Sequence, residues 1–301
     1  MWLLAYLAYL RLKIGAIILR TLIRLLSGGW IANPDTIHHL PSRDPQRRIK
    51  VHVYRPPLKK SRSRSGPGPV LINFHGSGFV IPAHGSDDEF CREMSQRANY
   101  TVLDVQYRLS PENPFPAAVH DTEDVLKWVL QQPALFDLSR VAVSGFSAGG
   151  TLALVAASTL FPKGTFRSVM TFYPSTEGHL DPASLIAPEA GGRPIPVSTM
   201  RLFASCYIQT EVDSQDPRLI PSFADTALFP KNALVITAGY DTLAAEGERF
   251  AKQLKKDTRR HVVYRRMARC NHGWDKKARI GTHEWEQKTQ AYDLAAEMLR
   301  L

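Results

Sequence analysis

The sequence is poor in cysteine, with only Cys91, Cys206 and Cys270 among its 301 residues. A count this small and odd argues against a framework of disulfide bonds and is typical of proteins in a reducing compartment. The three cysteines also lack the paired spacing of zinc-finger motifs. We therefore expect a cytoplasmic protein with neither disulfide bonds nor a cysteine-based zinc site.

Long hydrophobic runs are also missing, even within the apolar segment at residues 1–26. Its longest charge-free stretch is the first ten residues, whereas a transmembrane helix needs about 20 consecutive apolar residues. A signal peptide would place its basic residues before the apolar run, but here they follow it. At about 100° per residue, Lys13, Arg20 and Arg24 share one side of a helix. We expect an amphipathic helix that either packs on the domain as part of a lid or makes peripheral contact with a membrane.

Acidic residues are outnumbered, because 28 Asp and Glu face 38 Lys and Arg, which gives a net charge of +10. Basic clusters can attract nucleic acid or anionic membranes. Neither zinc-finger spacing nor the aromatic pattern of single-strand binding accompanies them here. We therefore interpret them as solvated loops and helix ends, and we predict no nucleic-acid partner. The clusters are residues 47–48, 59–64, 255–260, 265–269 and 276–279.

Short stretches typical of strands alternate with stretches typical of helices, which predicts an α/β fold with a mostly parallel sheet. The predicted strands are residues 48–54, 70–74, 101–105, 141–144, 168–172, 233–238 and 262–266. The predicted helices are residues 87–98, 116–130, 148–160, 243–256 and 284–299.

One region breaks this alternation. Residues 175–222 contain many prolines, little strand character and one helical stretch at 199–209. They are interpreted as a cap insertion over the carboxyl edge of the sheet. We expect one catalytic domain at residues 47–301, preceded by the apolar helix and cap region at residues 1–46.

The strongest motif is Gly145-Phe146-Ser147-Ala148-Gly149, a G-x-S-x-G between a predicted strand and a predicted helix. A nucleophilic serine at such a sharp turn is held in strained geometry, and its neighbours two positions away crowd together, which requires glycine. The following helix aims backbone N–H groups and a positive dipole at developing negative charge. We predict that Ser147 is a nucleophile.

A second small-residue turn, His75-Gly76-Ser77-Gly78, follows the strand predicted at residues 70–74. Small residues there allow backbone N–H groups to face the oxyanion of a tetrahedral intermediate. The loss of one such donor costs about 2.7–4 kcal/mol in the barrier. We predict an oxyanion loop, in which His75 shapes the loop and is not the catalytic base.

The base and its orienting acid are expected after the nucleophile, in the order Ser, Asp or Glu, His, on loops that follow strands. Asp241 and His272 meet both conditions, so Ser147, Asp241 and His272 form the predicted catalytic set. Other candidates precede the serine or the acid, open a strand or helix, lie inside a helix, or lack a preceding strand; they include His179, His261, His283, Asp213, Asp216, Asp225 and Glu246.

With these motifs, the sequence resembles the hormone-sensitive-lipase-type family of α/β-hydrolases, which includes many microbial and fungal carboxylesterases. The resemblance extends from about residue 50 to the C-terminus. It implies the α/β-hydrolase fold, a helical cap made of the N-terminal helices and a later insertion, and oxyanion donors at the N–H groups of Ser77, Gly78 and Ala148. Its further motifs are YRLSPE at 107–112, PFPAA at 114–118, DP at 216–217, TAGYD at 237–241, EGE at 246–248 and HG at 272–273.

Two positions depart from the family pattern. The family usually has glycine at Ser77, where a β-carbon restricts the backbone. It usually has an acidic residue at Phe146, so the polarity beside the nucleophile differs. Substrate preferences therefore do not transfer directly from the family.

The chemistry that this implies is hydrolysis of small or medium apolar carboxylic esters through an acyl-enzyme, with no metal or organic cofactor. A lactonase, a thioesterase or an acyltransferase of a biosynthetic pathway would use the same residues. An interfacial lipase is a further alternative, suggested by residues 1–26. A ligand-binding relative, such as the plant gibberellin receptors, would lack the histidine base. The oligomeric state stays open.

Overall fold

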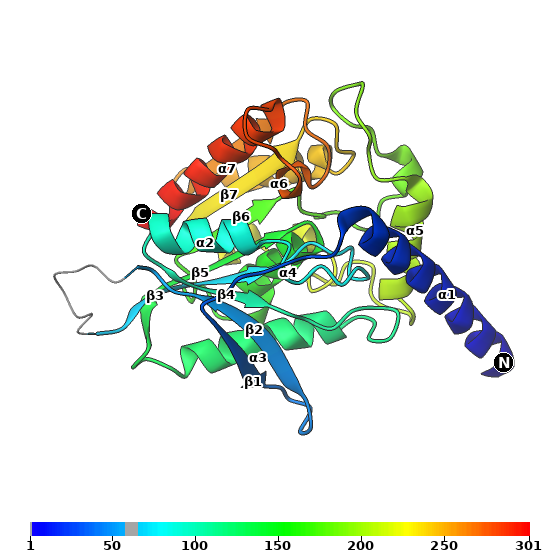
Figure 1. Ribbon diagram of the computed structural model, residues 1–301, viewed down its shortest axis with the longest axis horizontal. Coiled ribbons are helices and arrows are strands. Elements are labelled where there is room, and N and C mark those ends of the chain that lie inside the picture. Colours follow the sequence, from blue (N-terminus) through cyan, green and yellow to red (C-terminus); the bar gives the residue numbers. More distant parts are fainter. Residues whose placement is uncertain (1, 58–65) are drawn as a thin grey trace.

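The computed structural model describes residues 2–57 and 66–301, so the basic cluster at 59–64 lies outside the described residues. One eight-stranded sheet, in the order β1-β2-β4-β3-β5-β6-β7-β8, forms the centre of the molecule (Figure 1). The strands are β1 (Thr36–Pro41), β2 (Arg48–Tyr54), β3 (Gly68–Phe74), β4 (Thr101–Val105), β5 (Phe136–Phe146), β6 (Ser168–Phe172), β7 (Asn232–Ala238) and β8 (His261–Met267).

The sheet is mixed at one edge and parallel elsewhere. β1 pairs antiparallel with β2, and β2 pairs antiparallel with β4. All the remaining neighbours run parallel. Parallel strands covered by helices are buried on both faces and appear in sequence as continuous apolar runs, as the fully buried β6 does. The predicted α/β class with a mostly parallel sheet is confirmed.

Helices cover both faces of the sheet. α2 and α7 lie together on one face (Figure 1), where Phe90 and Tyr292 belong to one apolar core. α3, α4 and α6 cover the other face around a second core that includes Leu126, Leu152 and Phe250. The helices are α1 (Trp2–Ser27), α2 (Asp88–Arg97), α3 (Ala117–Leu130), α4 (Ala148–Val155), α5 (Val197–Tyr207), α6 (Ala244–Lys255) and α7 (His283–Arg300).

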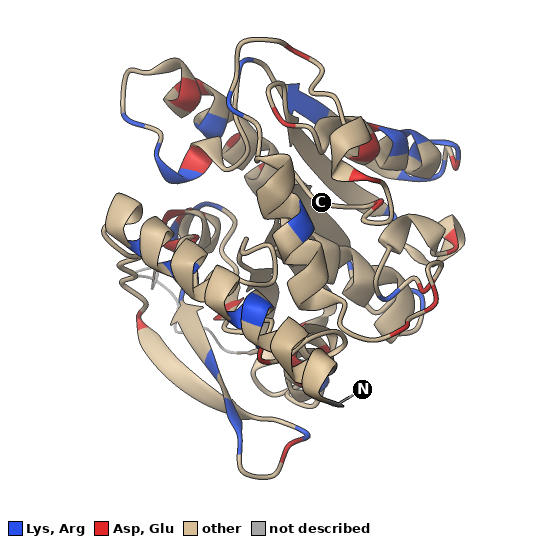
Figure 2. Cartoon of the chain, turned by 90° about the vertical axis from the view of Figure 1, so that its right-hand side faces the viewer, with Lys and Arg blue, Asp and Glu red and all other residues tan. Residues whose placement is uncertain are grey.

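α1 and α5 lie to one side of the sheet and pack against each other (Figures 1 and 2). Gly15 permits the close approach, because a β-carbon there would lie 3.2 Å from Leu202 Cδ1. Arg20 anchors α1: its guanidinium donates to both carboxylate oxygens of Glu112 at 2.8 Å and to the carbonyls of Val80 and Ser110 at 2.9 and 2.7 Å. The N-terminal segment is thus helical from Trp2 to Ser27, as predicted. In the described part of the chain, no helix is sufficiently long and apolar to cross a bilayer.

Candidate active site

The three predicted catalytic residues meet at the carboxyl ends of three parallel strands. Ser147 follows β5, Asp241 follows β7 and His272 follows β8. Ser147 Oγ lies 2.9 Å from His272 Nε2, and His272 Nδ1 lies 2.7 Å from Asp241 Oδ2. In this arrangement the Nδ1–H group donates to the carboxylate, so Nε2 is free to accept the serine proton.

Ser147 has a strained backbone, with φ 51° and ψ −120°. The residues two positions before and after Ser147 must be glycine for steric reasons. A β-carbon on Gly145 would lie 2.1 Å from the Gly149 carbonyl oxygen, and one on Gly149 would lie 1.9 Å from the Phe74 carbonyl oxygen. The turn therefore presents the hydroxyl at the start of α4, where unpaired N–H groups favour negative charge.

Asp241 is fully buried and is held by its own loop, because its Oδ1 accepts the Leu243 N–H at 3.1 Å. Tyr240 N–H donates to the Cys270 carbonyl at 2.9 Å, which ties this loop to the one that carries His272. The aromatic ring of Tyr173 meets the His272 ring edge to face, with centroids 4.6 Å apart. Tyr173 has φ 40° and follows β6. No sequence motif pointed to it as part of the site.

The predicted oxyanion loop lies next to Ser147. Gly78 has φ 54°, and a β-carbon on it would lie 2.5 Å from the Phe203 ring. Gly76 also needs to be small, because its β-carbon would lie 3.3 Å from the Phe146 carbonyl oxygen. The buried ring of His75 stacks on Tyr107 with centroids 4.4 Å apart. It is His272 that reaches Ser147, which agrees with a shaping role for His75.

A family model described as alpha/beta hydrolase fold matches residues 71–276. The chain belongs to this family. Ethyl acetate hydrolase of Pseudomonas putida is 30% identical over 77% of this chain and 73% of that protein. Such similarity, together with the motifs above, places the chain in the hormone-sensitive-lipase-type branch.

Further relatives point the same way. Esterase LipI of Mycobacterium tuberculosis is 34% identical over 68% of this chain, and the match spans 65% of LipI, slightly less than two thirds of its length. The solved structure of EstE1, a thermostable carboxylesterase from a metagenomic library, is 27% identical with a TM-score of 0.76 and covers 96% of each chain. An esterase of Pyrobaculum calidifontis is 27% identical with a TM-score of 0.73, covering 98% of this chain and 92% of that one.

This α/β-hydrolase accommodates Ser77 in place of the usual glycine without backbone strain. Among the described non-glycine residues with positive φ, Ser77 is absent. Its hydroxyl lies 2.7 Å from the Tyr107 hydroxyl and accepts the Phe79 N–H at 2.8 Å. The side chain therefore braces the loop from the side of Tyr107, and the backbone restriction expected from its β-carbon is harmless there.

The second departure, Phe146, is buried and stacks on Phe172 with centroids 4.4 Å apart. The ammonium of Lys276 lies 3.4 Å from the centroid of the Phe146 ring. It also lies 2.8 Å from carboxylate oxygens of both Asp87 and Asp275. A cation therefore lies behind the nucleophile turn, where the family usually carries an acid.

Two aspartates keep this buried lysine charged. Burial lowers the pKa of Lys276, but the charges of Asp275 and Asp87 outweigh it, so the pKa lies above its ordinary value. Burial likewise raises the pKa of Asp275, and Lys276 outweighs it in the opposite direction, which leaves that pKa lowered. Asp275 also accepts the hydroxyls of Tyr173 at 2.7 Å and Tyr292 at 2.9 Å. The loop of His272 is thus fixed to the core by charge and hydrogen bonds.

A cavity of about 140 Å³ opens beside Ser147 and is lined mainly by apolar side chains. Gly78 and Ala148 line it next to the nucleophile. Ser77 is buried and turns its hydroxyl to Tyr107. The wall facing them comes largely from α5 and the segments around it, including Met200, Phe203, Tyr207, Ile208 and Leu219.

Glu246 lines the same cavity from α6 and is almost fully buried. Its two carboxylate oxygens accept the N–H groups of Thr176 and Glu177, each at 3.0 Å. Burial, only partly offset by these bonds, raises the pKa of Glu246 to about 7. The sequence-based elimination of Glu246 as the orienting acid agrees with this geometry, since the carboxylate that meets His272 is Asp241.

Proposed function

We propose that this protein is a carboxylic ester hydrolase that works through an acyl-enzyme on Ser147. The observation that carries the proposal is the hydrogen-bonded series from Ser147 through His272 to Asp241, which opens onto an apolar cavity. Several similar proteins are named as esterases or ester hydrolases, which supports the same reaction class. The ligand-binding alternative is less favoured, because the histidine base is present and reaches the serine.

In the proposed mechanism, His272 Nε2 takes the proton as Ser147 Oγ attacks the ester carbonyl carbon. Asp241 orients the imidazole and stabilises its charged form. The N–H groups of Ser77, Gly78 and Ala148 hold the oxyanion. The tetrahedral intermediate then collapses, His272 returns the proton to the leaving alcohol, and the acyl group stays on Ser147. Water, deprotonated by His272, attacks the acyl-enzyme and releases the acid.

The size of the cavity sets the expected substrate. An apolar cavity of about 150 Å³ holds a molecule as large as benzene, and the cavity beside Ser147 measures about 140 Å³. We infer that one side of the ester is a short aliphatic or single-ring group. The same residues would process lactones or thioesters, so reaction rates on a panel of matched oxygen esters, lactones and thioesters decide among these alternatives.

Two experiments test the proposal directly. The purified protein should hydrolyse short-chain nitrophenyl esters, with a fall in kcat/KM as the acyl chain outgrows the cavity. A fluorophosphonate should inactivate it with one label per chain, and peptide mapping should place that label on Ser147. A label on another residue, or full ester hydrolysis after complete labelling of Ser147, would contradict the assignment.

We also propose that α1 and α5 form a cap over this cavity and that the outer face of α1 contacts anionic membrane surfaces. α1 carries basic residues and no acidic ones (Figure 2). Several of its large apolar side chains are about half exposed or more: Leu3, Leu4, Leu7, Ile14, Ile17, Ile18, Leu22, Leu25 and Leu26. A helix with exposed apolar and basic side chains binds the interface of a bilayer without spanning it.

Sedimentation with vesicles tests the membrane contact. The protein should bind phosphatidylserine vesicles more than phosphatidylcholine vesicles, and L4Q/L25Q should bind less while keeping its esterase rate in solution. The matched control is I186Q/I280Q, which changes two exposed apolar residues outside α1. Equal binding by both double variants would contradict a role for α1. Deletion of residues 1–26 should lower activity or stability if the helix is also part of the cap.

A further inference from the structure

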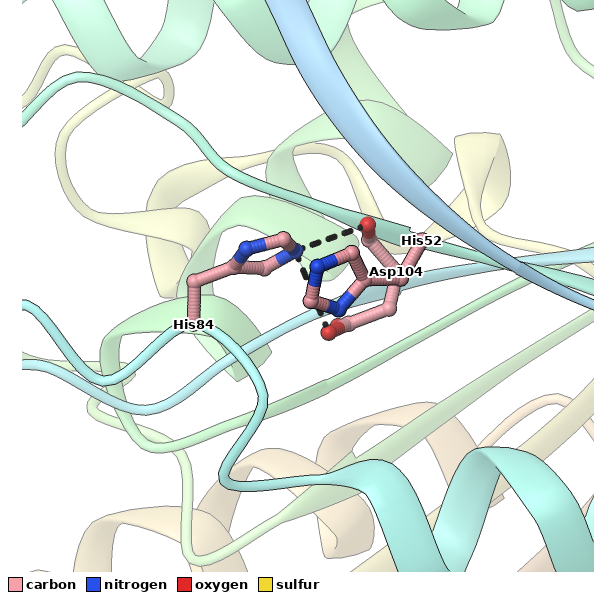
Figure 3. Close-up of side chains that lie close together, drawn as sticks. All are labelled: His52, His84 and Asp104. Atoms are coloured by element: carbon pink, nitrogen blue, oxygen red, sulfur yellow. Dashed lines mark hydrogen bonds and ion pairs between the residues drawn. The ribbon is translucent and has the colours of Figure 1, made fainter. Parts of the chain in front are cut away.

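A second cluster of chemistry-bearing side chains lies apart from the catalytic residues. His52 on β2 and Asp104 on β4 are directly opposed in the antiparallel register. His84, from the segment between β3 and α2, meets them (Figure 3). One ligand-type atom from each of the three residues lies within 4.8 Å of the other two. None of the three takes part in the proposed ester hydrolysis.

The contacts within this cluster leave polar atoms unpaired. Asp104 is fully buried and His52 is 5% exposed. In the described part of the chain, neither His52 Nδ1 nor Asp104 Oδ2 has a hydrogen-bond partner, although Asp104 Oδ2 lies 3.4 Å from His84 Nε2. An unpartnered buried polar atom costs about 1–3 kcal/mol, so two of them in one cluster call for a ligand.

We propose that His52, His84 and Asp104 form a binding site for a divalent transition metal, with Zn²⁺ the ion that fits best. Two imidazoles and one carboxylate are a donor set that zinc accepts, and three protein ligands leave a fourth position for water or a carbonyl oxygen.

The distances suit this ion. In a tetrahedral zinc site, with bonds of about 2.0–2.1 Å, neighbouring ligand atoms lie about 3.4 Å apart. His84 Nε2 lies 3.4 Å from Asp104 Oδ2. The same nitrogen is hydrogen-bonded to the Asp104 carbonyl oxygen at 3.1 Å, a contact that a bound metal would replace. The His52 and His84 rings face each other with centroids 4.0 Å apart. The ligand atoms of the three residues lie within 4.8 Å of one another, so the imidazoles would have to rotate to reach the tetrahedral spacing.

The surroundings support a ligand role. Asp104 Oδ1 accepts a hydrogen bond from Asn73 Nδ2 at 2.9 Å, which orients the carboxylate and leaves Oδ2 directed at the cluster. A bound cation would offset the free-energy cost of burying the Asp104 carboxylate.

The site lies close to the predicted oxyanion loop. His84 lies a few residues after the loop, and its ring centroid is 5.8 Å from that of His75. A metal bound to His84 would fix this segment to β2 and β4. We therefore expect the ion to stabilise the fold, while ester hydrolysis itself proceeds without it.

The test is metal binding by the full-length chain after removal of metal with a chelator. Calorimetry with Zn²⁺ alone should show one site per chain, and Zn²⁺ should raise the melting temperature. Co²⁺ should give the visible d–d absorption of a four-coordinate site. H84Q, which changes a loop residue, should weaken binding by at least tenfold and abolish the shift in melting temperature.

The matched control is H39Q, which removes an exposed imidazole on β1 and should bind Zn²⁺ as the wild type does. H52Q provides a second variant if H84Q folds poorly. Absence of Zn²⁺ binding by the wild type overturns the proposal, as does equal binding by H84Q or H52Q. Since neither result involves ester turnover, this test can fail without affecting the proposed esterase, and the reverse also holds.

Discussion

Two aspartate–histidine pairs lie on the same sheet, and they differ in what meets the other side of the imidazole. In one pair, Asp241 Oδ2 and His272 Nδ1 are 2.7 Å apart, and the opposite nitrogen faces Ser147. In the other, Asp104 and His84 are 3.4 Å apart, and the imidazole lies against His52. A carboxylate–imidazole pair is therefore not catalytic by itself. A serine and a cavity favour acyl transfer, whereas a second imidazole in a closed space favours a cation.

The largest effect should come from removing the nucleophile. We expect S147A to lower kcat by about 10⁶-fold, as loss of the serine does in other serine hydrolases. Steady-state hydrolysis of a nitrophenyl ester measures the loss, and an unchanged melting temperature shows that the fold survives. If S147A hydrolysed esters at the wild-type rate, Ser147 would not be the nucleophile that the Asp241–His272 pair activates.

The comparison is sharpened by making the same change in both pairs. D241N should lower kcat by about 10⁴-fold, because an amide at this position favours the wrong imidazole tautomer. D104N should affect zinc binding and thermal stability far more than it affects kcat. Parallel measurement of kcat, melting temperature and zinc binding separates the two roles. A folded D104N protein as inactive as D241N would contradict the separation between a catalytic Asp241 and a metal-binding Asp104.

The two pairs are joined through buried charge. Lys276 contacts two carboxylates, that of Asp87 and that of Asp275, which is close to His272 in the chain. The Asn73 amide in turn donates hydrogen bonds to both Asp87 and Asp104. K276M leaves two buried carboxylates without their cation, so we expect a loss of about 3–5 kcal/mol in the free energy of unfolding.

The neighbouring exposed lysine offers the control for this change. K277M should alter the free energy of unfolding by less than about 0.5 kcal/mol, since Lys277 is exposed. Urea denaturation of both variants measures the difference. Similar stabilities for K276M and the wild type would show that the buried ion pairs contribute nothing net.

A smaller effect is expected at the oxyanion loop. G78A places a β-carbon against the Phe203 ring in a backbone conformation with φ 54°, which should displace the N–H donor and lower kcat by about 10²-fold. G281A introduces the same type of strain at φ 83°, with no atom near its β-carbon. It should leave kcat unaltered, so a similar loss in both variants would refute a local effect.

The smallest effect concerns a third buried carboxyl group, that of Glu246, which is bound by backbone N–H groups and no histidine. Its pKa rises from 4.5 in the unfolded chain to about 7 in the fold, so the folded state holds the proton more tightly. Stability should therefore decrease as the pH rises from about 4.5 to 7. E246Q should flatten this part of the profile of melting temperature against pH; an unchanged profile would contradict the assignment.

Much of the fold was predictable, because the relevant signals are local. Apolar runs located β4 and β6, and an alternating pattern located β2; all three begin and end where predicted. β2 is more buried than its alternating RIKVHVY sequence indicates. β1 was not predicted, since its alternating TIHHLP sequence is short, ends in proline and lies at an edge. The predicted helix at 148–160 is α-helical only to Val155 and continues as a π-helical turn, Ala156–Leu160.

The candidate site was predictable in its chemistry and less so in its surroundings. The glycines around Ser147 reflect contacts within the turn, and the order of serine, acid and histidine follows from the order of the strands. Tyr173 and Lys276 belong to no motif, and their positions depend on contacts between distant segments. The sequence therefore predicted which side chains meet, and that they react stays a prediction; it did not reveal what fixes them in place.

The contact between Gly78 and Phe203 has a consequence for redesign. Phe203 belongs to α5, forms part of the cavity wall and occupies the space that a side chain on Gly78 would need. A smaller residue there would admit bulkier esters and at the same time release the loop that steadies the developing negative charge. If the protein is the proposed esterase, we expect a change at Phe203 to alter substrate range and turnover together, because one aromatic ring contacts both the cavity and Gly78.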